Sequence, residues 1–370
     1  MSQPLGVAVV GAGYWGPNLV RNFGASPEWD LRLVCDLDLD RARAVAGPHV
    51  DVTDRIHRVL GDSSIDAVAI ATPARTHRGL ALDALSAGKH VLVEKPLADS
   101  VMGGQAMVSL AERLGLVLMT DHTYCYTPAV QRMRELVGSG ELGDVHFVDS
   151  VRINLGLVQP DIDVLWDLAP HDLSILDFVL PGGLPTHGIA ATGADPIGAG
   201  RACVGHLTLP LPGDGLAHVH VNWLSPTKIR QMVIGGSRRT LVWDDLNPQQ
   251  RLSIYDRGVD LARTSVAGAD RAASQVSYRL GDTWSPALPE REALGAMVTE
   301  FAGAIREGRP PLTDGHAGLR VLSVLEAASA RLADGTADVP AKGPQPEESA
   351  PAPVPAGADP AAQPALEVVR

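Results

Sequence analysis

Short apolar runs alternate with amphipathic stretches through the first third of the chain. The apolar runs have the length and composition of buried strands, at 7–10, 31–35, 65–71, 90–93 and 116–121. The stretches between them carry apolar residues every three or four positions and predict helices at 39–46, 51–60 with Thr53 as the N-cap, 75–86 and 101–114. This alternation predicts a doubly wound parallel sheet over residues 1–125.

The pattern changes after residue 143. Following a connecting helix at 128–137, segments of alternating apolar and polar residues occur at 144–153, 202–209, 217–223, 229–234, 240–243 and 252–255. They lack helices between them, which predicts a mainly antiparallel sheet. Two amphipathic helices close the domain, at 292–307 and from Thr313 and Asp314 to Gly335. The fold class is therefore α/β, with an N-terminal Rossmann domain at 1–125 and a C-terminal α+β domain at 126–335.

Two segments do not fit this scheme. Residues 257–289 contain few large apolar side chains and predict a long loop. Residues 336–370 are rich in Pro and Ala without hydrophobic periodicity, and they predict a disordered tail.

A glycine-rich turn follows the first strand. Gly11, Gly13 and Gly16 form a GxGxxG pattern between a strand and a helix, and Asp36 ends the next strand about 20 residues later. A glycine turn of another α/β protein is the alternative, but the three features together favour a dinucleotide site. Tyr14 and Trp15 lie inside the turn and are candidate cofactor contacts. A carboxylate at position 36 would accept hydrogen bonds from ribose hydroxyls and repel a 2′-phosphate, so NAD is expected as the cofactor rather than NADP.

Further candidate residues follow the later strands, because the carboxyl ends of parallel strands border the ligand crevice. These candidates are Thr72, Pro73, His77, Glu94, Lys95 and His122. His77 could instead be a structural residue of the following helix, and Glu94 with Lys95 could be a solvated pair on a surface turn. If Lys95 lies over the nicotinamide, it can hold a hydroxyl oxygen and stabilise the charge that develops there.

A second constellation lies in the C-terminal domain. Asp167 and His171 are four residues apart and therefore share one helix face. An imidazole can take a hydroxyl proton, and a carboxylate one turn earlier can orient the imidazole. Helix capping by Asp167 and ordinary packing of His171 are the alternative. Candidate substrate contacts are Tyr124, Trp166 and, in a polar loop before the helix, Arg152, Asn154 and Gln159.

Composition narrows the functional classes. The 370 residues carry a net charge of −12 without a basic face, which argues against nucleic-acid binding. No apolar run reaches the roughly 18 residues of a membrane span and no signal peptide precedes the first strand, so a cytoplasmic location is expected. The three cysteines are widely spaced and predict reduced, buried thiols. His218 and His220 share a strand face, but no further ligands complete a metal site.

Four motifs resemble one known family. GxGYWGPN, ATPAxTH, EKP and DLAPHD, in this order and spacing, resemble the Gfo/Idh/MocA oxidoreductases over roughly residues 5–335. The YWGPNLVRNF extension is most similar to their sugar 3-dehydrogenase branch. The resemblance implies NAD-dependent oxidation of a sugar hydroxyl, with Lys95, Asp167 and His171 as catalytic residues. It also implies a homodimer or homotetramer formed through the open C-terminal sheet.

The substrate remains open between two kinds of amino sugar. The branch resemblance implies a UDP- or dTDP-linked sugar oxidised at C3. However, residues 154–177 contain no Lys or Arg but include five aspartates, namely Asp161, Asp163, Asp167, Asp172 and Asp177. An acidic cleft would favour a polycationic aminoglycoside intermediate instead. Two further alternatives are a 3-ketoreductase that runs the same chemistry in reverse with NAD(P)H and a non-catalytic NAD-sensing module.

Overall fold

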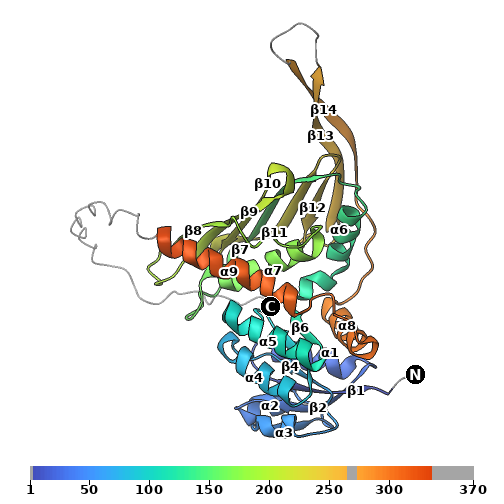
Figure 1. The fold of residues 1–370 in the computed structure, drawn as a ribbon, viewed down its shortest axis with the longest axis vertical. Helices are drawn as coiled ribbons and strands as arrows, with labels where there is room; N and C mark the ends of the chain where they lie inside the picture. The colour runs from blue at the N-terminus through green and yellow to red at the C-terminus, as the bar shows by residue number, and fades with distance from the viewer. Residues whose placement is uncertain (1–2, 265–272, 336–370) are drawn as a thin grey trace, which may run out of the picture.

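The computed structural model describes residues 3–264 and 273–335 (Figure 1). Its first sheet has six parallel strands in the order β3-β2-β1-β4-β5-β6. The strands are β1 Leu5–Val10, β2 Trp29–Cys35, β3 Asp51–Thr53, β4 Ala67–Ile70, β5 His90–Glu94 and β6 Leu118–Asp121. The chain reverses its direction of winding between β1 and β4, and a doubly wound sheet binds its ligand at such a point. The predicted Rossmann architecture is confirmed.

Five helices cover the two faces of this sheet (Figure 1). They are α1 Gly16–Ala25, α2 Leu39–Val45, α3 Ile56–Leu60, α4 Ala74–Ser86 and α5 Val101–Leu114. The helix expected at 51–60 was predicted to start too early, because Asp51–Thr53 pairs with β2 as an edge strand. Helix α3 begins only after Thr53, whose Oγ1 accepts a hydrogen bond from the Arg55 amide at 3.1 Å. A three-residue strand with one buried side chain has too little apolar pattern to be distinguished from a helix start.

The second sheet has eight strands in the order β14-β13-β12-β11-β7-β10-β9-β8. The strands are β7 Val145–Leu155, β8 Ala190–Ala194, β9 Val204–Leu211, β10 Gly215–Asn222, β11 Leu224–Gly236, β12 Thr240–Asp244, β13 Leu252–Thr264 and β14 Ala273–Trp284. Only the β7–β10 pair is parallel. The mainly antiparallel sheet is therefore confirmed.

One face of the second sheet is covered by helices, and these helices also reach the Rossmann half. Helix α7, Val164–Val179, packs on β7, β9 and β10, and α6, Pro128–Gly138, packs beside it. Helix α9, Gly315–Gly335, contacts both α7 and α5, while α8, Ala293–Glu307, contacts α1 (Figure 1). The two sheets are thus held against each other by the last helices of the chain. At the carboxyl end of β5, Lys95 contacts helix α7 of the second half.

The long loop expected at 257–289 is wrong. Strands β13 and β14 form an antiparallel hairpin that projects beyond the sheet (Figure 1). Arg279 fixes the pairing through ion pairs with Asp256 at 2.9 Å and Asp260 at 2.9 Å. Both faces of the hairpin meet solvent, since Tyr278 is 75% exposed on one face and Ser277, on the other, is also exposed. Apolar residues do alternate with polar ones at Val276, Tyr278 and Leu280, but this short run lies in a segment otherwise poor in large apolar side chains, which is why a loop was expected.

Other expectations are partly tested. Cys35, Cys125 and Cys203 are free and buried, as predicted. Within the residues described, no helix is both long enough and apolar enough to cross a membrane. The tail expected at 336–370 lies outside the described residues, and the domain limits at 125 and 335 stay predictions.

Candidate active site

The glycine turn leaves space for a dinucleotide at the start of α1. Gly11 has a φ of +100°, and a Cβ there would lie 2.6 Å from the Ala71 carbonyl oxygen. A Cβ on Gly16 would lie 2.1 Å from the Gly11 oxygen, so neither position admits a side chain. A Cβ on Gly13 would meet nothing within 4 Å, because this position faces open space. The amides of the first helical turn border that space and suit a diphosphate.

Asp36 lies beside the turn, where the ribose acid was predicted. Its carboxylate accepts hydrogen bonds from the amides of Ala12 at 2.6 Å and Asp38 at 2.9 Å. The carboxylate is therefore fixed at the end of β2, and its remaining lone pairs can accept bonds from hydroxyl groups. Glycine spacing, open space and an oriented acid together fit NAD.

The two aromatic residues of the turn point in different directions. Tyr14 is 95% exposed, whereas the Trp15 indole donates a hydrogen bond to Asp121 at the end of β6, at 2.7 Å. Burial raises the pKa of the Asp121 carboxyl. The indole therefore ties the glycine turn to the far edge of the sheet.

His77 joins two strand ends. Its imidazole is buried, with Nε2 2.7 Å from the Thr72 carbonyl oxygen and Nδ1 2.9 Å from that of Pro96. Burial lowers its pKa, and a neutral ring can donate to one of these oxygens at a time. This geometry fits a structural role for His77 in helix α4, which the sequence offered as the alternative to cofactor binding. Thr72 and Pro73 lie at the end of β4, where the sequence placed them, and the Thr72 hydroxyl contacts that of Thr76 at 2.7 Å.

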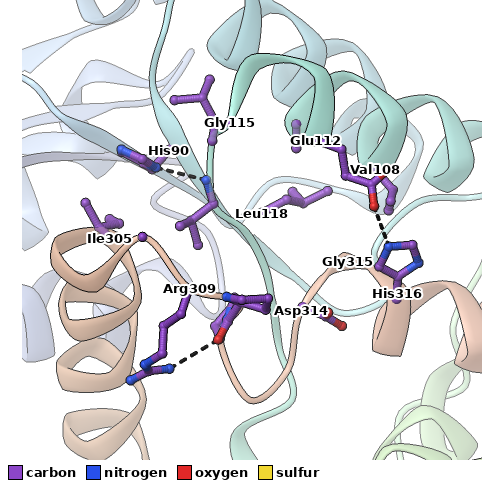
Figure 2. A pocket seen from close by; sticks show the side chains of 16 residues that line it. His90, Val108, Glu112, Gly115, Leu118, Ile305, Arg309, Asp314, Gly315 and His316 are labelled. Carbon is purple, nitrogen blue, oxygen red and sulfur yellow. Dashed lines mark hydrogen bonds and ion pairs between the residues drawn. The ribbon is translucent and has the colours of Figure 1, made fainter.

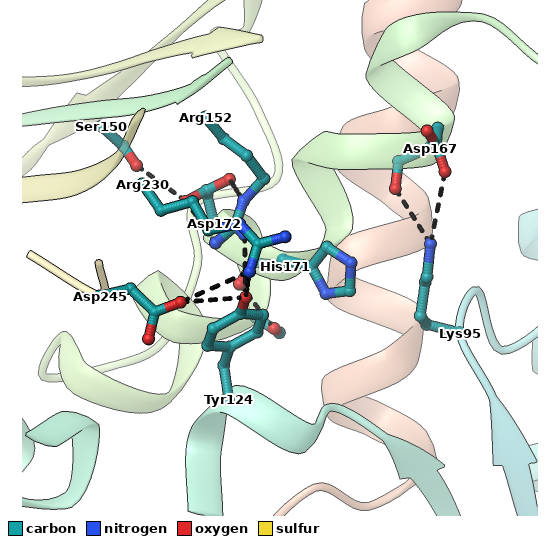
Figure 3. Close-up of polar contacts among 10 residues, drawn as sticks. Lys95, Tyr124, Ser150, Arg152, Asp167, His171, Asp172, Arg230 and Asp245 are labelled. Atoms are coloured by element: carbon teal, nitrogen blue, oxygen red, sulfur yellow. Dashed lines mark hydrogen bonds and ion pairs between the residues drawn. The ribbon is translucent and has the colours of Figure 1, made fainter. Parts of the chain in front are cut away.

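Lys95 reaches from the end of β5 to helix α7. Its ammonium nitrogen lies 3.0 Å from the Asp167 carbonyl oxygen and 3.7 Å from Oδ1 of the same residue (Figure 3). The side chain of Lys95 is only 16% exposed. The neighbouring Glu94 carboxylate accepts the Lys95 amide, and burial, with the Asp121 charge adding to it, raises the pKa of Glu94 to about 8.

Helix α7 carries the second set of groups. Asp163 caps its first turn by accepting the amides of Leu165 at 2.9 Å and Trp166 at 3.0 Å. The capping role that the sequence left open for Asp167 thus belongs to Asp163. Asp167 accepts the Trp223 indole N–H at 2.9 Å, so its carboxylate bridges Trp223 and Lys95. Among the contacts of the described residues there is none between Asp167 and the His171 ring, so the expected orientation of His171 by Asp167 is not observed.

His171 instead packs against Tyr124. The two rings meet edge to face, with centroids 5.3 Å apart (Figure 3). Burial, aided by the positive charges of Lys95, Arg152 and Arg230, holds the pKa of His171 well below its ordinary value of 6.5. The imidazole is therefore neutral at neutral pH and can accept a proton.

The sequence suggested a loop at Arg152, but the residue lies on a strand. It is on strand β7, 2% exposed, and its guanidinium holds Asp172 at 2.6 Å and 3.2 Å. Ser150 donates to the same carboxylate at 2.9 Å, and the Arg152 guanidinium lies 4.7 Å from the centre of the Tyr124 ring. Every nitrogen of this guanidinium has a partner, since Nη1 donates to the Tyr124 hydroxyl at 3.2 Å. Arg152 therefore holds Tyr124 in position through contacts with both its hydroxyl and its ring.

The remaining candidates are spread around the crevice. Asn154 is on β7 rather than in a loop, and Gln159 is half-buried in the segment before α7. The Trp166 indole donates to Ser329 of α9 at 2.8 Å, so its N–H is already used within the protein. His122 is 3% exposed with its pKa lowered to about 4 by burial, and its Nε2 has no partner among the described residues.

The sequence analysis missed Arg230 and Asp245, two charged residues beside Tyr124. Arg230, on β11, donates to the Tyr124 hydroxyl at 3.0 Å and lies 3.5 Å from Asp245. Arg230 shares the inward-facing register of Met232 and Ile234, both fully buried. A charged residue in the apolar register of a strand is the signal that would have found it.

The acidic cleft expected from residues 154–177 is largely neutralised. Asp163 caps a helix, Asp167 contacts Lys95, and Asp172 is paired with Arg152. Asp177 is paired with Arg320 at 2.5 Å, and Asp161 alone of the five is exposed. Counting charges within one stretch of sequence overlooked the cations that other strands and helices supply.

Two features lie away from this crevice. A pocket of about 260 Å³ opens at the amino ends of β5 and β6, between His90, Glu112 and His316 (Figure 2). This edge of the sheet is opposite the one that carries Lys95. On the uncovered face of the second sheet, the ring of His206 stacks on those of His218 and His220, with centroids 5.2 Å and 4.3 Å apart. No cluster suited to a metal ion occurs within the described ranges.

Comparisons with known proteins agree with this geometry. The family model described as "Oxidoreductase family, NAD-binding Rossmann fold" (GFO_IDH_MocA) matches residues 5–122. A UDP-N-acetylglucosamine 3-dehydrogenase of Acidithiobacillus ferrooxidans is 30% identical over 85% of this chain and 93% of its own length. A crystal form of that enzyme superimposes with a TM-score of 0.74 and 26% identity, covering 89% of this chain and 97% of the enzyme. GenD2 from gentamicin A biosynthesis, solved with NAD, has a TM-score of 0.73 and 25% identity over 90% of this chain and 96% of its own.

Proposed function

The chain belongs to the Gfo/Idh/MocA family of oxidoreductases, with NAD as cofactor, and from this premise we propose that it oxidises the C3 hydroxyl of a nucleotide-linked amino sugar. The observation that carries the proposal is the meeting of Lys95, from the Rossmann half, with the helix that bears His171. A neutral imidazole can act as the general base of alcohol oxidation, and a cation on a facing element can stabilise the charge that develops on the oxygen.

Lys95 acts on the hydroxyl oxygen. NAD, held by Gly11, Gly13, Gly16 and Asp36, supplies the hydride acceptor when bound. The ammonium of Lys95 donates a hydrogen bond to the substrate oxygen and stabilises its developing negative charge. Asp167 positions this ammonium, and the bond from Trp223 fixes the Asp167 carboxylate in turn.

His171 takes the hydroxyl proton. Its ring is neutral in the folded protein because burial and the nearby cations disfavour the charged form. Tyr124 supports the ring from one side, and neither ring nitrogen has a partner among the residues described. A free ring nitrogen is available to accept the proton as the hydride leaves the carbon.

The nucleotide-linked sugar is favoured by two observations. A relative named as a UDP-N-acetylglucosamine 3-dehydrogenase is 30% identical over 85% of this chain, and most of the aspartates that suggested a polycationic substrate are already paired. We further propose that the enzyme is cytoplasmic and forms a homodimer or homotetramer through the uncovered face of the second sheet.

An aminoglycoside intermediate is the second candidate. Its support is the similarity to GenD2 together with the exposed carboxylate of Asp161. NADH formation with UDP-N-acetylglucosamine and with a pseudotrisaccharide aminoglycoside, each at low and high salt, separates the two. Turnover of the cationic substrate alone, weakened by salt, would replace the first candidate with the second.

Adding a 3-keto nucleotide sugar and NADH to this panel tests the two remaining alternatives. NADH consumption by a 3-keto sugar, without NADH formation from the alcohol, would identify a ketoreductase. NAD binding without turnover of any sugar in either direction would identify a sensing module.

A further inference from the structure

Arg230 differs from the other arginine beside the active site. Arg152 uses all three guanidinium nitrogens within the protein, on Asp172 and the Tyr124 hydroxyl. Arg230 uses only Nη1, which donates to Tyr124 at 3.0 Å and lies 3.5 Å from Asp245. No described residue accepts a hydrogen bond from Nε or Nη2 of Arg230, and its side chain is 33% exposed. One edge of this guanidinium is therefore available to a ligand.

The register of the sheet places two like charges opposite each other. Arg230 of β11 is the direct antiparallel partner of Arg152 of β7, on the face covered by helices. Like charges at directly opposed positions destabilise a sheet unless anions compensate them. Asp172 compensates Arg152 with two short contacts, whereas Asp245 meets Arg230 only at 3.5 Å. Of the two arginines, Arg230 therefore has the less closely compensated positive charge.

Arg230 is also close to the reacting groups. It bonds the hydroxyl of Tyr124, whose ring lies against His171 (Figure 3). Its charge is one of those that disfavour protonation of His171. One side chain, Tyr124, thus separates Arg230 from the imidazole that is proposed to accept the substrate proton.

We infer that the free edge of Arg230 binds a paired-oxygen anion of the substrate and selects anionic over neutral sugars. Two parallel N–H donors match the two oxygens of a phosphate or a carboxylate, a geometry that lysine cannot reproduce. Within the proposed function this anion is the diphosphate of the nucleotide-linked sugar, and the inference rests on that function for its choice of substrate. A sugar carboxylate presents the same pair of oxygens, so the test includes both.

The test measures binding without turnover. Protein saturated with NADH is titrated calorimetrically with UDP-N-acetylglucosamine, with glucuronate and with neutral N-acetylglucosamine. We compare wild type, Arg230→Met, Arg230→Lys and the control Arg251→Met, which removes the same charge from an exposed side chain. Thermal unfolding of each variant shows whether it is folded.

Loss of a charged bidentate contact is expected to weaken binding of the anionic ligand by about 10- to 100-fold in Arg230→Met. Arg230→Lys recovers only part of this loss, Arg251→Met binds as wild type, and neutral N-acetylglucosamine is unaffected throughout. Loss of affinity for the nucleotide sugar alone identifies the diphosphate as the anion, and loss for glucuronate alone identifies a carboxylate.

Three results would overturn the inference. They are wild-type binding of both anions by Arg230→Met, equal weakening of the neutral sugar, and failure of the wild type to bind either anion. A separate measurement of NADH formation distinguishes failure of the Arg230 inference from failure of the proposed function. Turnover of the nucleotide sugar with no effect at Arg230 leaves the function standing, and Arg230-dependent binding without turnover leaves only the binding site.

Discussion

The raised pKa of Glu94 makes the stability of this protein depend on pH in a way that one substitution should remove. The carboxyl of Glu94 has a pKa of about 8 in the folded protein because burial and the Asp121 charge disfavour its ionised form. Its ordinary value is 4.5, so in the unfolded chain it is ionised at neutral pH. Since the folded state holds the proton more tightly, its contribution to stability is complete below pH 4.5 and is lost as the pH rises towards 8.

The size of the effect follows from linkage. One pKa unit corresponds to about 1.4 kcal/mol, so raising the pH from the ordinary pKa of 4.5 to 7 changes the free energy of unfolding by at most about 3.5 kcal/mol. The side chain is half-buried, and solvent screening reduces this figure to about 1–3 kcal/mol. Glutamine has the same shape, can accept the Lys95 amide, and has no proton to lose.

The assay is denaturant unfolding of wild type and Glu94→Gln between pH 4.5 and pH 8. We expect Glu94→Gln to gain about 1–3 kcal/mol relative to wild type as the pH rises to 7, because only the wild type must keep a proton on residue 94. Glu290→Gln, at an exposed glutamate, is the matched control and should follow the wild type. Parallel stability curves for wild type and Glu94→Gln would refute the reasoning.

Three further predictions concern charge and cofactor. Asp172→Asn should lower the free energy of unfolding by about 3–5 kcal/mol, because it leaves the buried Arg152 charge without its counter-ion. The control Asp83→Asn, at an exposed side chain of α4, should leave stability unchanged, and equal stability of the two variants would contradict the prediction. As the pH falls, kcat/KM should decline only below pH 6.5, because the pKa of His171 is lowered and its ring stays neutral down to that pH. A decline centred at or above pH 6.5 would show that His171 is not the titrating base. Wild type should bind NADH much more tightly than NADPH, and Asp36→Ala should narrow that gap in fluorescence titrations, whereas a wild-type preference for NADPH would disprove the ribose role of Asp36.

Local patterns were sufficient to predict much of the fold. The strand, glycine turn and helix around Gly11 and the amphipathic helices α5, α8 and α9 each bury a continuous apolar face, which leaves a period in the sequence. The β13–β14 hairpin was missed because its segment has few large apolar residues, and the short alternation at Val276, Tyr278 and Leu280 lies on a solvent-exposed face. The edge strand β3 was missed because a strand of three residues has no period.

The site was predictable only where its residues act through one segment. Lys95 and His171 lie in compact motifs, and the sequence placed both at the crevice. The partners of Asp167 come from β5 and from Trp223 after β10, and Arg230 reaches Tyr124 from β11, so these contacts depend on sheet register. Register between strands far apart in the chain leaves no mark in either strand alone.

The central claim is that Lys95 and His171 carry out the oxidation together, and one measurement tests it directly. NADH formation is followed after NAD-saturated enzyme is mixed with UDP-N-acetylglucosamine, for wild type, Lys95→Met and His171→Asn, with NAD binding measured in parallel. We predict that both variants bind NAD as the wild type does and form NADH about 10²- to 10⁴-fold more slowly. NADH formation at the wild-type rate in either variant would contradict the account.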